Sequence, residues 1–239
     1  MNTPEGTSQV RAAVKRRAAY ALALFATAAG AVAVAIVAGG VLAPYGGAPA
    51  ETWTVAIGVV LASLAVGHWI GRRDTGTDER LRYIRLSMAL FLAALATALS
   101  IVFLRLLPPA VAQGPPEPIL GLVGIATALF MFPSLFVGVV PPVLARLARD
   151  AAVQGGGAPA RAMAEMYGLA ALGGIAGDLF AWSLYLPSNE AAMALAAIAA
   201  LYFAMAVGFA IAGGAEPRRL ALVLAVAAAF TVAIAVWAV

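Results

Sequence analysis

Charged residues divide this chain into seven long apolar runs. The runs are 18–50, 52–71, 86–104, 118–145, 166–189, 191–215 and 220–239. An α-helix needs about 20 apolar residues to cross the roughly 30 Å hydrocarbon core of a bilayer. Each run reaches that length or falls one residue short, and the only charge inside a run is Asp178. The pattern predicts seven transmembrane helices.

We place these helices near 18–43, 53–71, 83–107, 119–149, 163–186, 189–213 and 218–239. The predicted fold is an all-α integral membrane protein, with a basic N-terminal segment over 1–17 and a seven-helix transmembrane domain over 18–239. The apolar core of a signal peptide is about 7–15 residues long. Because the first run is far longer, we expect it to be an uncleaved span.

Basic residues segregate to one set of alternate connections, which predicts an orientation. Arg105 alone falls on the other side; the remaining 14 are Arg11, Lys15, Arg16, Arg17, Arg72, Arg73, Arg80, Arg82, Arg85, Arg146, Arg149, Arg161, Arg218 and Arg219. By the positive-inside rule the N-terminus is cytoplasmic and the C-terminus external. We expect a prokaryotic cytoplasmic (inner) membrane. Orientation and the lipid bilayer account for the net charge of +4, so we predict no nucleic-acid partner.

Composition excludes several classes of protein. Apolar residues make up 64% of the chain and charged residues 11%, against about 25% charged in soluble domains. Retinal needs a lysine inside the bundle, but the only lysine is Lys15. There is no cysteine and one histidine, His68, whereas haem, iron–sulfur and zinc sites use several such ligands. We therefore predict no cofactor and no metal site.

The fourth predicted helix contains prolines. Over 119–149 it would be about 46 Å long if straight, and Pro133, Pro141 and Pro142 offer places to bend it. A kink frees backbone carbonyls, which a membrane tolerates only beside protein or a wet cavity. The prolines thus indicate either a packing kink or a broken helix that lines a cavity.

One carboxylate, Asp178, lies deep in a predicted span. Burying it costs about 2.5–3.5 kcal/mol on insertion scales, so we expect it to face the bundle interior and have a partner. Helical spacing puts Tyr167, Trp182 and Tyr185 on its face. The group is either a ligand or ion site that holds a cation, or a hydrogen bond that locks two helices. Arg105 is a candidate partner, although it more simply extends to water.

His68 is a second candidate polar group, toward the cytoplasmic end of its helix. It is either hydrogen-bonded locally or part of a proton relay or quinone contact. Two glycine pairs at Gly-x-x-x-Gly spacing, Gly67 with Gly71 and Gly173 with Gly177, predict close helix packing within the chain or between chains.

Three segments, in order, carry a resemblance to a known family. They are Leu61-Ala-Ser-Leu-Ala-Val-Gly67-His68-Trp-Ile-Gly71-Arg72-Arg73, Pro133 followed by Gly138-Val-Val-Pro141-Pro142-Val-Leu-Ala-Arg146, and Tyr167-Gly-Leu-Ala-Ala-Leu-Gly173-Gly174-Ile-Ala-Gly177-Asp178. Together they resemble the membrane domain of the spermidine-synthase-like, or fused major-facilitator/spermidine-synthase, proteins. The resemblance runs from about residue 53 to 215 and implies a major-facilitator-like half-module.

The resemblance does not extend to the family's soluble aminopropyltransferase domain, whose Gly-rich pocket is absent from these 239 residues. We therefore expect no enzyme activity from this chain. Two functions stay open. One is a non-catalytic membrane subunit or anchor that packs against another membrane protein or a second copy, or recruits a soluble enzyme. The other is a transporter module for a small, cationic, polyamine-like solute with Asp178 in the path. A third alternative, an intramembrane enzyme, has the least support, because the chain has few side chains suited to acid–base catalysis.

Overall fold

A computed structural model describes residues 4–46, 48–73, 78–106, 118–188 and 190–216, without the side chains of 4–7, 9 and 184–188. Every regular element in these ranges is helical. The elements are α1 (Pro4–Leu42), η1 (Ala43–Tyr45), α2 (Pro49–Arg72), α3 (Glu79–Leu106), α5 (Ile119–Gln154), α6 (Pro159–Ser188) and α7 (Ala191–Ala212). The all-α prediction is confirmed for the described residues.

Five described helices are long and apolar enough to cross a membrane, namely α1, α2, α3, α5 and α7. This supports a multi-pass membrane protein. Helix α6 is not among these five, and its side chains at 184–188 lie outside the described set. The predicted span over 218–239 lies outside the described residues. The count of seven and the half-module architecture therefore stay predictions.

Several helices are longer than we predicted. Helix α1 begins at Pro4 rather than at residue 18, so the described part of the basic 1–17 segment is its first turns. Helix α5 continues past Arg149 to Gln154, and α6 begins at Pro159 rather than 163. An apolar run predicts only the segment that fits the hydrocarbon core. The helical backbone can continue beyond that segment into polar residues.

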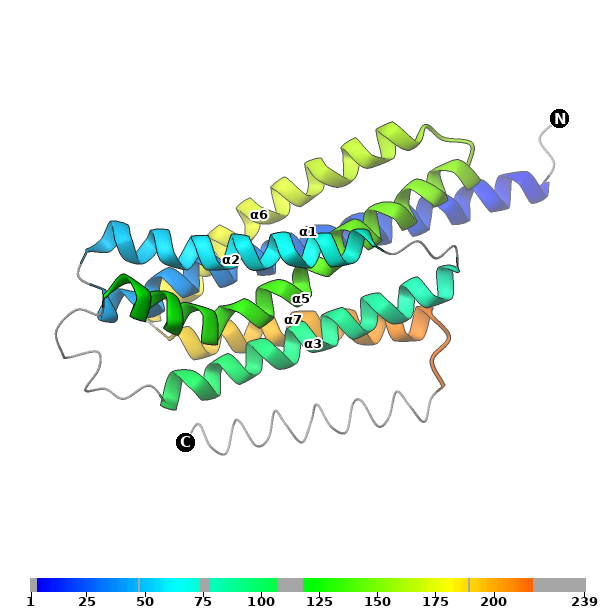
Figure 1. Cartoon of the computed structure of the whole chain (residues 1–239). Coiled ribbons are helices and arrows are strands. Elements are labelled where there is room, and N and C mark those ends of the chain that lie inside the picture. The colour runs from blue at the N-terminus through cyan, green and yellow to red at the C-terminus, as the bar shows by residue number, and fades with distance from the viewer. Residues whose placement is uncertain (1–3, 47, 74–77, 107–117, 189, 217–239) are drawn as a thin grey trace.

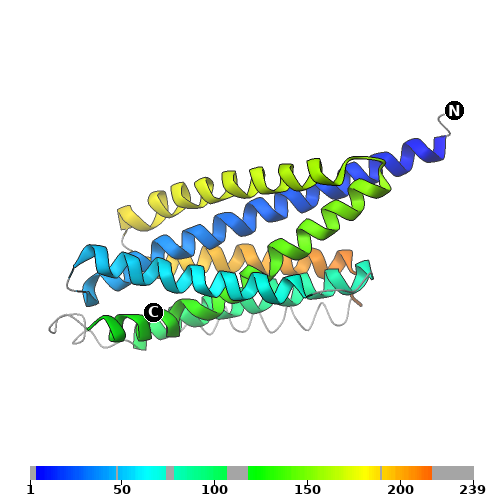
Figure 2. The ribbon, with the colours of Figure 1, turned by 45° about the horizontal axis from the view of Figure 1, so that its top comes forward.

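The helices form an elongated bundle whose two ends differ. Both views place the start of α1, the end of α2, the start of α3, the α5–α6 connection and the end of α7 together (Figure 1, Figure 2). We call this the basic end, since its ion pairs involve Arg16, Arg17, Arg82, Arg149 and Arg161. Helix α5 packs against α1, α2 and α3, whereas α6 lies along α1 and α7 along α3. Helix α6 forms an edge of the bundle in both views.

The prolines of α5 are accommodated by packing. The helix continues through Pro133, Pro141 and Pro142, although a proline cannot donate to the carbonyl four residues earlier. The carbonyl that Pro133 leaves free belongs to Leu129, and the Ser100 hydroxyl of α3 donates a hydrogen bond to it. A neighbouring helix thus supplies the missing donor at Pro133. Ser100, Leu129 and Pro133 also line a cavity of about 140 Å³ between α3 and α5, so both interpretations of the prolines stay predictions.

Both glycine pairs face other helices of the same chain. A methyl group at Gly67 or Gly71 of α2 would overlap backbone carbonyl groups of α5. At Gly173 and Gly177 of α6 it would overlap the backbone of α1, around Phe25 and Ala29. Only glycine permits such a close approach of two backbones. These surfaces are therefore occupied within the bundle and are not free for another chain.

Candidate functional site

Helix α6 has one packed face and one open face. Gly173, Gly177 and Ala181, which are spaced one turn apart, are buried against the rest of the bundle. The opposite side carries large apolar side chains that are more than half exposed. These side chains are Leu172, Ile175, Leu179 and Trp182. Together with Asp178, which lies beside them, they form what we call the outer face of α6.

Asp178 lies on the flank between these two faces. It follows Gly177 directly, so it is turned by about 100° from the packed face. Its side chain is half-buried, and it makes no hydrogen bond or ion pair with any described residue. We expected a carboxylate pointing inward with a partner, and the described part of the chain provides neither.

The aromatic residues expected around Asp178 are only partly brought together. Trp182 is one helical turn away, with a side chain that is 62% exposed. Tyr167 is 61% exposed, but 11 residues of helix put it roughly 16 Å from Asp178. Tyr185 belongs to α6, and its side chain lies outside the described set. The described residues thus offer Trp182 and no aromatic enclosure around the carboxylate.

The two candidate polar partners lie elsewhere. Arg105 is exposed in the last turn of α3 and forms no ion pair with Asp178. His68 is exposed on α2, and its Nδ1 lies 2.8 Å from the Leu64 carbonyl oxygen. That local contact is the simpler of the two interpretations of His68. Nearby, the Arg73 guanidinium sits 3.4 Å from the ring centre of Trp69.

The basic end holds a network of ion pairs between residues that the sequence analysis used only for orientation. Arg82 of α3 donates to Asp150 of α5 at 2.6 Å, and the Arg82 side chain is only 9% exposed. Arg149 contacts the same carboxylate at 3.2 Å. Arg146 of α5 donates to the Arg72 carbonyl of α2. The network ties α5 to α2 and α3.

Two tyrosines extend this network to α1. The hydroxyls of Tyr20 and Tyr83 lie 2.5 Å apart, and Tyr83 donates to Glu79 at 2.9 Å. Arg16 pairs with the same carboxylate at 3.5 Å and donates to the Gln154 amide oxygen at 2.8 Å. The sequence does show acidic and basic residues near the ends of the predicted spans on the predicted cytoplasmic side. The pairing itself depends on tertiary contacts.

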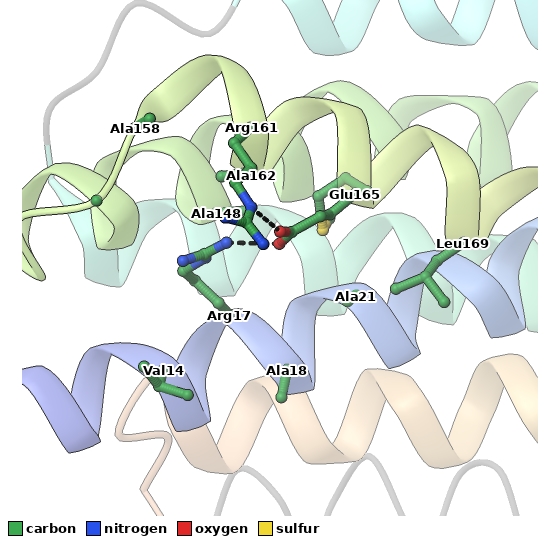
Figure 3. A pocket seen from close by; sticks show the side chains of 12 residues that line it. Val14, Arg17, Ala18, Ala21, Ala148, Ala158, Arg161, Ala162, Glu165 and Leu169 are labelled. Atoms are coloured by element: carbon green, nitrogen blue, oxygen red, sulfur yellow. Dashed lines mark hydrogen bonds and ion pairs between the residues drawn. The ribbon is translucent and has the colours of Figure 1, made fainter.

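Helix α6 joins the basic end through one carboxylate. Glu165 accepts hydrogen bonds from Arg17 of α1 at 2.7 Å and from Arg161 one turn earlier at 2.9 Å. These side chains border a cavity between α1 and α6 (Figure 3). No group of three metal-ligating side chains occurs among the described residues. The arrangement holds helix ends together and presents cationic groups.

Comparison with known proteins adds no relative: no family model, no curated protein and no solved structure matches this chain. The resemblance carried by the three sequence segments therefore stays a prediction.

Proposed function

We propose that this chain is a non-catalytic, multi-pass membrane subunit that packs against a partner membrane protein through the outer face of α6. The observation that carries the proposal is Asp178. A carboxylate within a span costs about 2.5–3.5 kcal/mol on insertion scales and is retained where it finds a partner. No described residue supplies one, so we assign that role to a donor or basic group on a partner helix.

The surroundings of Asp178 support this assignment. Both glycine pairs are used within the chain, and the charges of the basic end find partners across helices. The outer face of α6 differs, since it combines exposed Trp182 and Leu179 with a carboxylate. Aromatic anchors around a desolvated polar contact are typical of interface centres.

The proposal includes an orientation. We place the basic end at the cytoplasmic surface of a prokaryotic inner membrane, with the N-terminus inside. The gathering of the basic residues at one end supports this, because arginines and lysines concentrate in cytoplasmic loops. The same surface is where a soluble enzyme would be recruited.

Transport is the weaker alternative. It needs a polar path through the bundle with Asp178 in it. Ser100 donates a hydrogen bond to the carbonyl that Pro133 frees, and Asp178 does not border the cavities that lie between α1 and α6, beside α3 and α7, or between α3 and α5. Polyamine uptake by the purified, reconstituted chain, lost in Asp178→Asn, would favour transport over the subunit.

A site-specific photo-crosslinker tests the subunit proposal. Placed at Leu179 on the outer face, it should join the chain to one stoichiometric membrane partner, or to a second copy, in native membranes. Placed at Leu61, an equally exposed leucine of α2, it should not. Asp178→Asn should reduce the Leu179 product, because the amide loses the charge that the partner group recognises.

Two outcomes would overturn the proposal. One is cross-linking from Leu179 only to lipid, with a partner-free chain after mild-detergent extraction. The other is cross-linking only within the chain, to residues 217–239, which would make Asp178 an internal helix contact. Both are read by the mass of the product.

A further inference from the structure

A cavity opens at the basic end between α1 and the start of α6. Its volume is about 530 Å³, within the range of about 300–1,000 Å³ that small-molecule sites occupy. Side chains from α1, from the α5–α6 connection and from the first turns of α6 line it (Figure 3). Buried Ala148, Ala162 and Met166 are among the lining residues. The cavity is far from Asp178 along α6, so it is independent of the proposed partner surface.

The polarity of the lining changes along the helices. Helices α1 and α6 both run from the basic end into the bundle (Figure 1). Along α1 the exposed Val14 precedes Arg17 and Ala21 follows it, whereas along α6 Arg161 precedes Met166 and Leu169, which lie deeper. A molecule in this cavity therefore meets cations at one end and hydrocarbon at the other. Amphipathic ligands have this distribution, and free inorganic ions do not.

The polar half carries a net positive charge. Arg17 and Arg161 share a single carboxylate, that of Glu165. A guanidinium has five N–H donors in a planar fork that matches phosphate oxygens. Arg161 is 82% exposed, so most of its donors face solvent. Helix α6 begins at Pro159 beside these groups, and its N-terminal dipole adds a partial positive charge.

We propose that this cavity binds an anionic phospholipid. The phosphate contacts Arg17 and Arg161 at the membrane surface, and an acyl chain lies against Met166 and Leu169. Inorganic phosphate shares the headgroup chemistry, but it would leave the apolar half unused. Glu165 orders the two arginines and at the same time competes with the phosphate for their donors.

The test measures lipid retention by the full-length chain in native mass spectrometry after delipidation and titration. Phosphatidylglycerol should bind one to one and about tenfold more tightly than phosphatidylcholine, because both carry a phosphate but the choline cation is repelled by the two arginines. Arg17→Gln combined with Arg161→Gln should remove that preference. Lys15→Gln removes one positive charge from α1, the helix of Arg17, outside the cavity lining, and it should leave the preference intact.

A second variant has an effect of opposite sign. Glu165→Gln removes the competing carboxylate, so it should tighten phosphatidylglycerol binding several-fold, since bonds to charged groups are the stronger ones. Misfolding does not predict a gain. Ala18→Phe, which fills the cavity, should weaken lipid binding while it leaves both arginines in place.

Three results would overturn the proposal. The first is an equal loss of preference in Lys15→Gln, which would indicate diffuse surface attraction. The second is competition by inorganic phosphate at the same concentration as the lipid, with Ala18→Phe without effect, which would indicate an ion site. The third is unchanged lipid binding in the double arginine variant, because the assigned contacts would then be absent.

Discussion

The basic end and the outer face of α6 treat charge in opposite ways. At the basic end, Asp150 accepts from an arginine of a different helix at 2.6 Å, and Glu165 does so at 2.7 Å. On the outer face, Asp178 is half-buried without a partner among the described residues. Both regions belong to the same bundle, which contains many arginines. A lack of basic residues therefore does not explain why Asp178 has no partner among the described residues.

The comparison separates charges that assemble the fold from a charge available to something outside it. Ion pairs between helices fix how the helix ends meet. Their residues lie near the expected membrane surface, where the charged groups keep part of their hydration and the cost of desolvation is smaller. Asp178 lies deeper and has no such function within the described bundle. A polar group kept at such a depth is a functional hypothesis by default.

The largest expected effect comes from separating α6 from α1. Gly177→Leu would force the two backbones apart, and we expect a loss of about 3 kcal/mol in the free energy of unfolding, because overpacking against backbone has little room to relax. Thermal unfolding in detergent, followed by circular dichroism, measures it. The change would also turn the flank that bears Asp178, so both regions would be disturbed together.

Gly168→Leu is the matched control on the same helix. No described atom lies within 4 Å of a methyl group placed at Gly168, so leucine there should be neutral or stabilising by up to about 1 kcal/mol through helix propensity. Equal destabilisation by both substitutions would contradict the close α1–α6 contact.

Much of this fold was predictable from where the charges interrupt the apolar runs. Six described helices follow the first six apolar runs in order, since charged side chains are costly to place in hydrocarbon. The helix ends were not predictable from the same signal. The first turns of α1 and the last of α5 lie beyond the apolar runs, where Arg16 and Gln154 stabilise them by a contact between residues 138 positions apart.

An intermediate effect should follow from breaking the most buried ion pair. Asp150→Leu removes the carboxylate that accepts from Arg82, whose side chain is 9% exposed, and we expect a loss of about 2 kcal/mol in the free energy of unfolding. Adding Arg82→Met should recover part of that loss, because the buried charge that has lost this carboxylate is then removed. If the double variant lost more free energy of unfolding than the two single variants added together, this account would be contradicted.

The candidate sites were less predictable than the fold. Asp178 stands out in the sequence because it is the one charge in a run, yet its direction depends on which face of α6 the glycines take up. Tyr167 shares its face on a helical wheel but lies three turns away, a separation that a wheel hides. The cavity beside Arg17 needed two helices distant in sequence to lie parallel, which no local pattern predicts.

The smallest expected effect is the one that distinguishes the two regions. In the isolated chain, Asp178→Leu should leave the free energy of unfolding unchanged or raise it by about 1 kcal/mol, since it removes a carboxylate that is costly to place in a membrane and breaks no described contact. The sign is opposite to that of Asp150→Leu in the same thermal unfolding assay. Asp178→Asn, which keeps the shape and polarity, should lie between them. A loss as large as that of Asp150→Leu would mean that the isolated chain itself holds the partner of Asp178, and the outer face of α6 would then resemble the basic end.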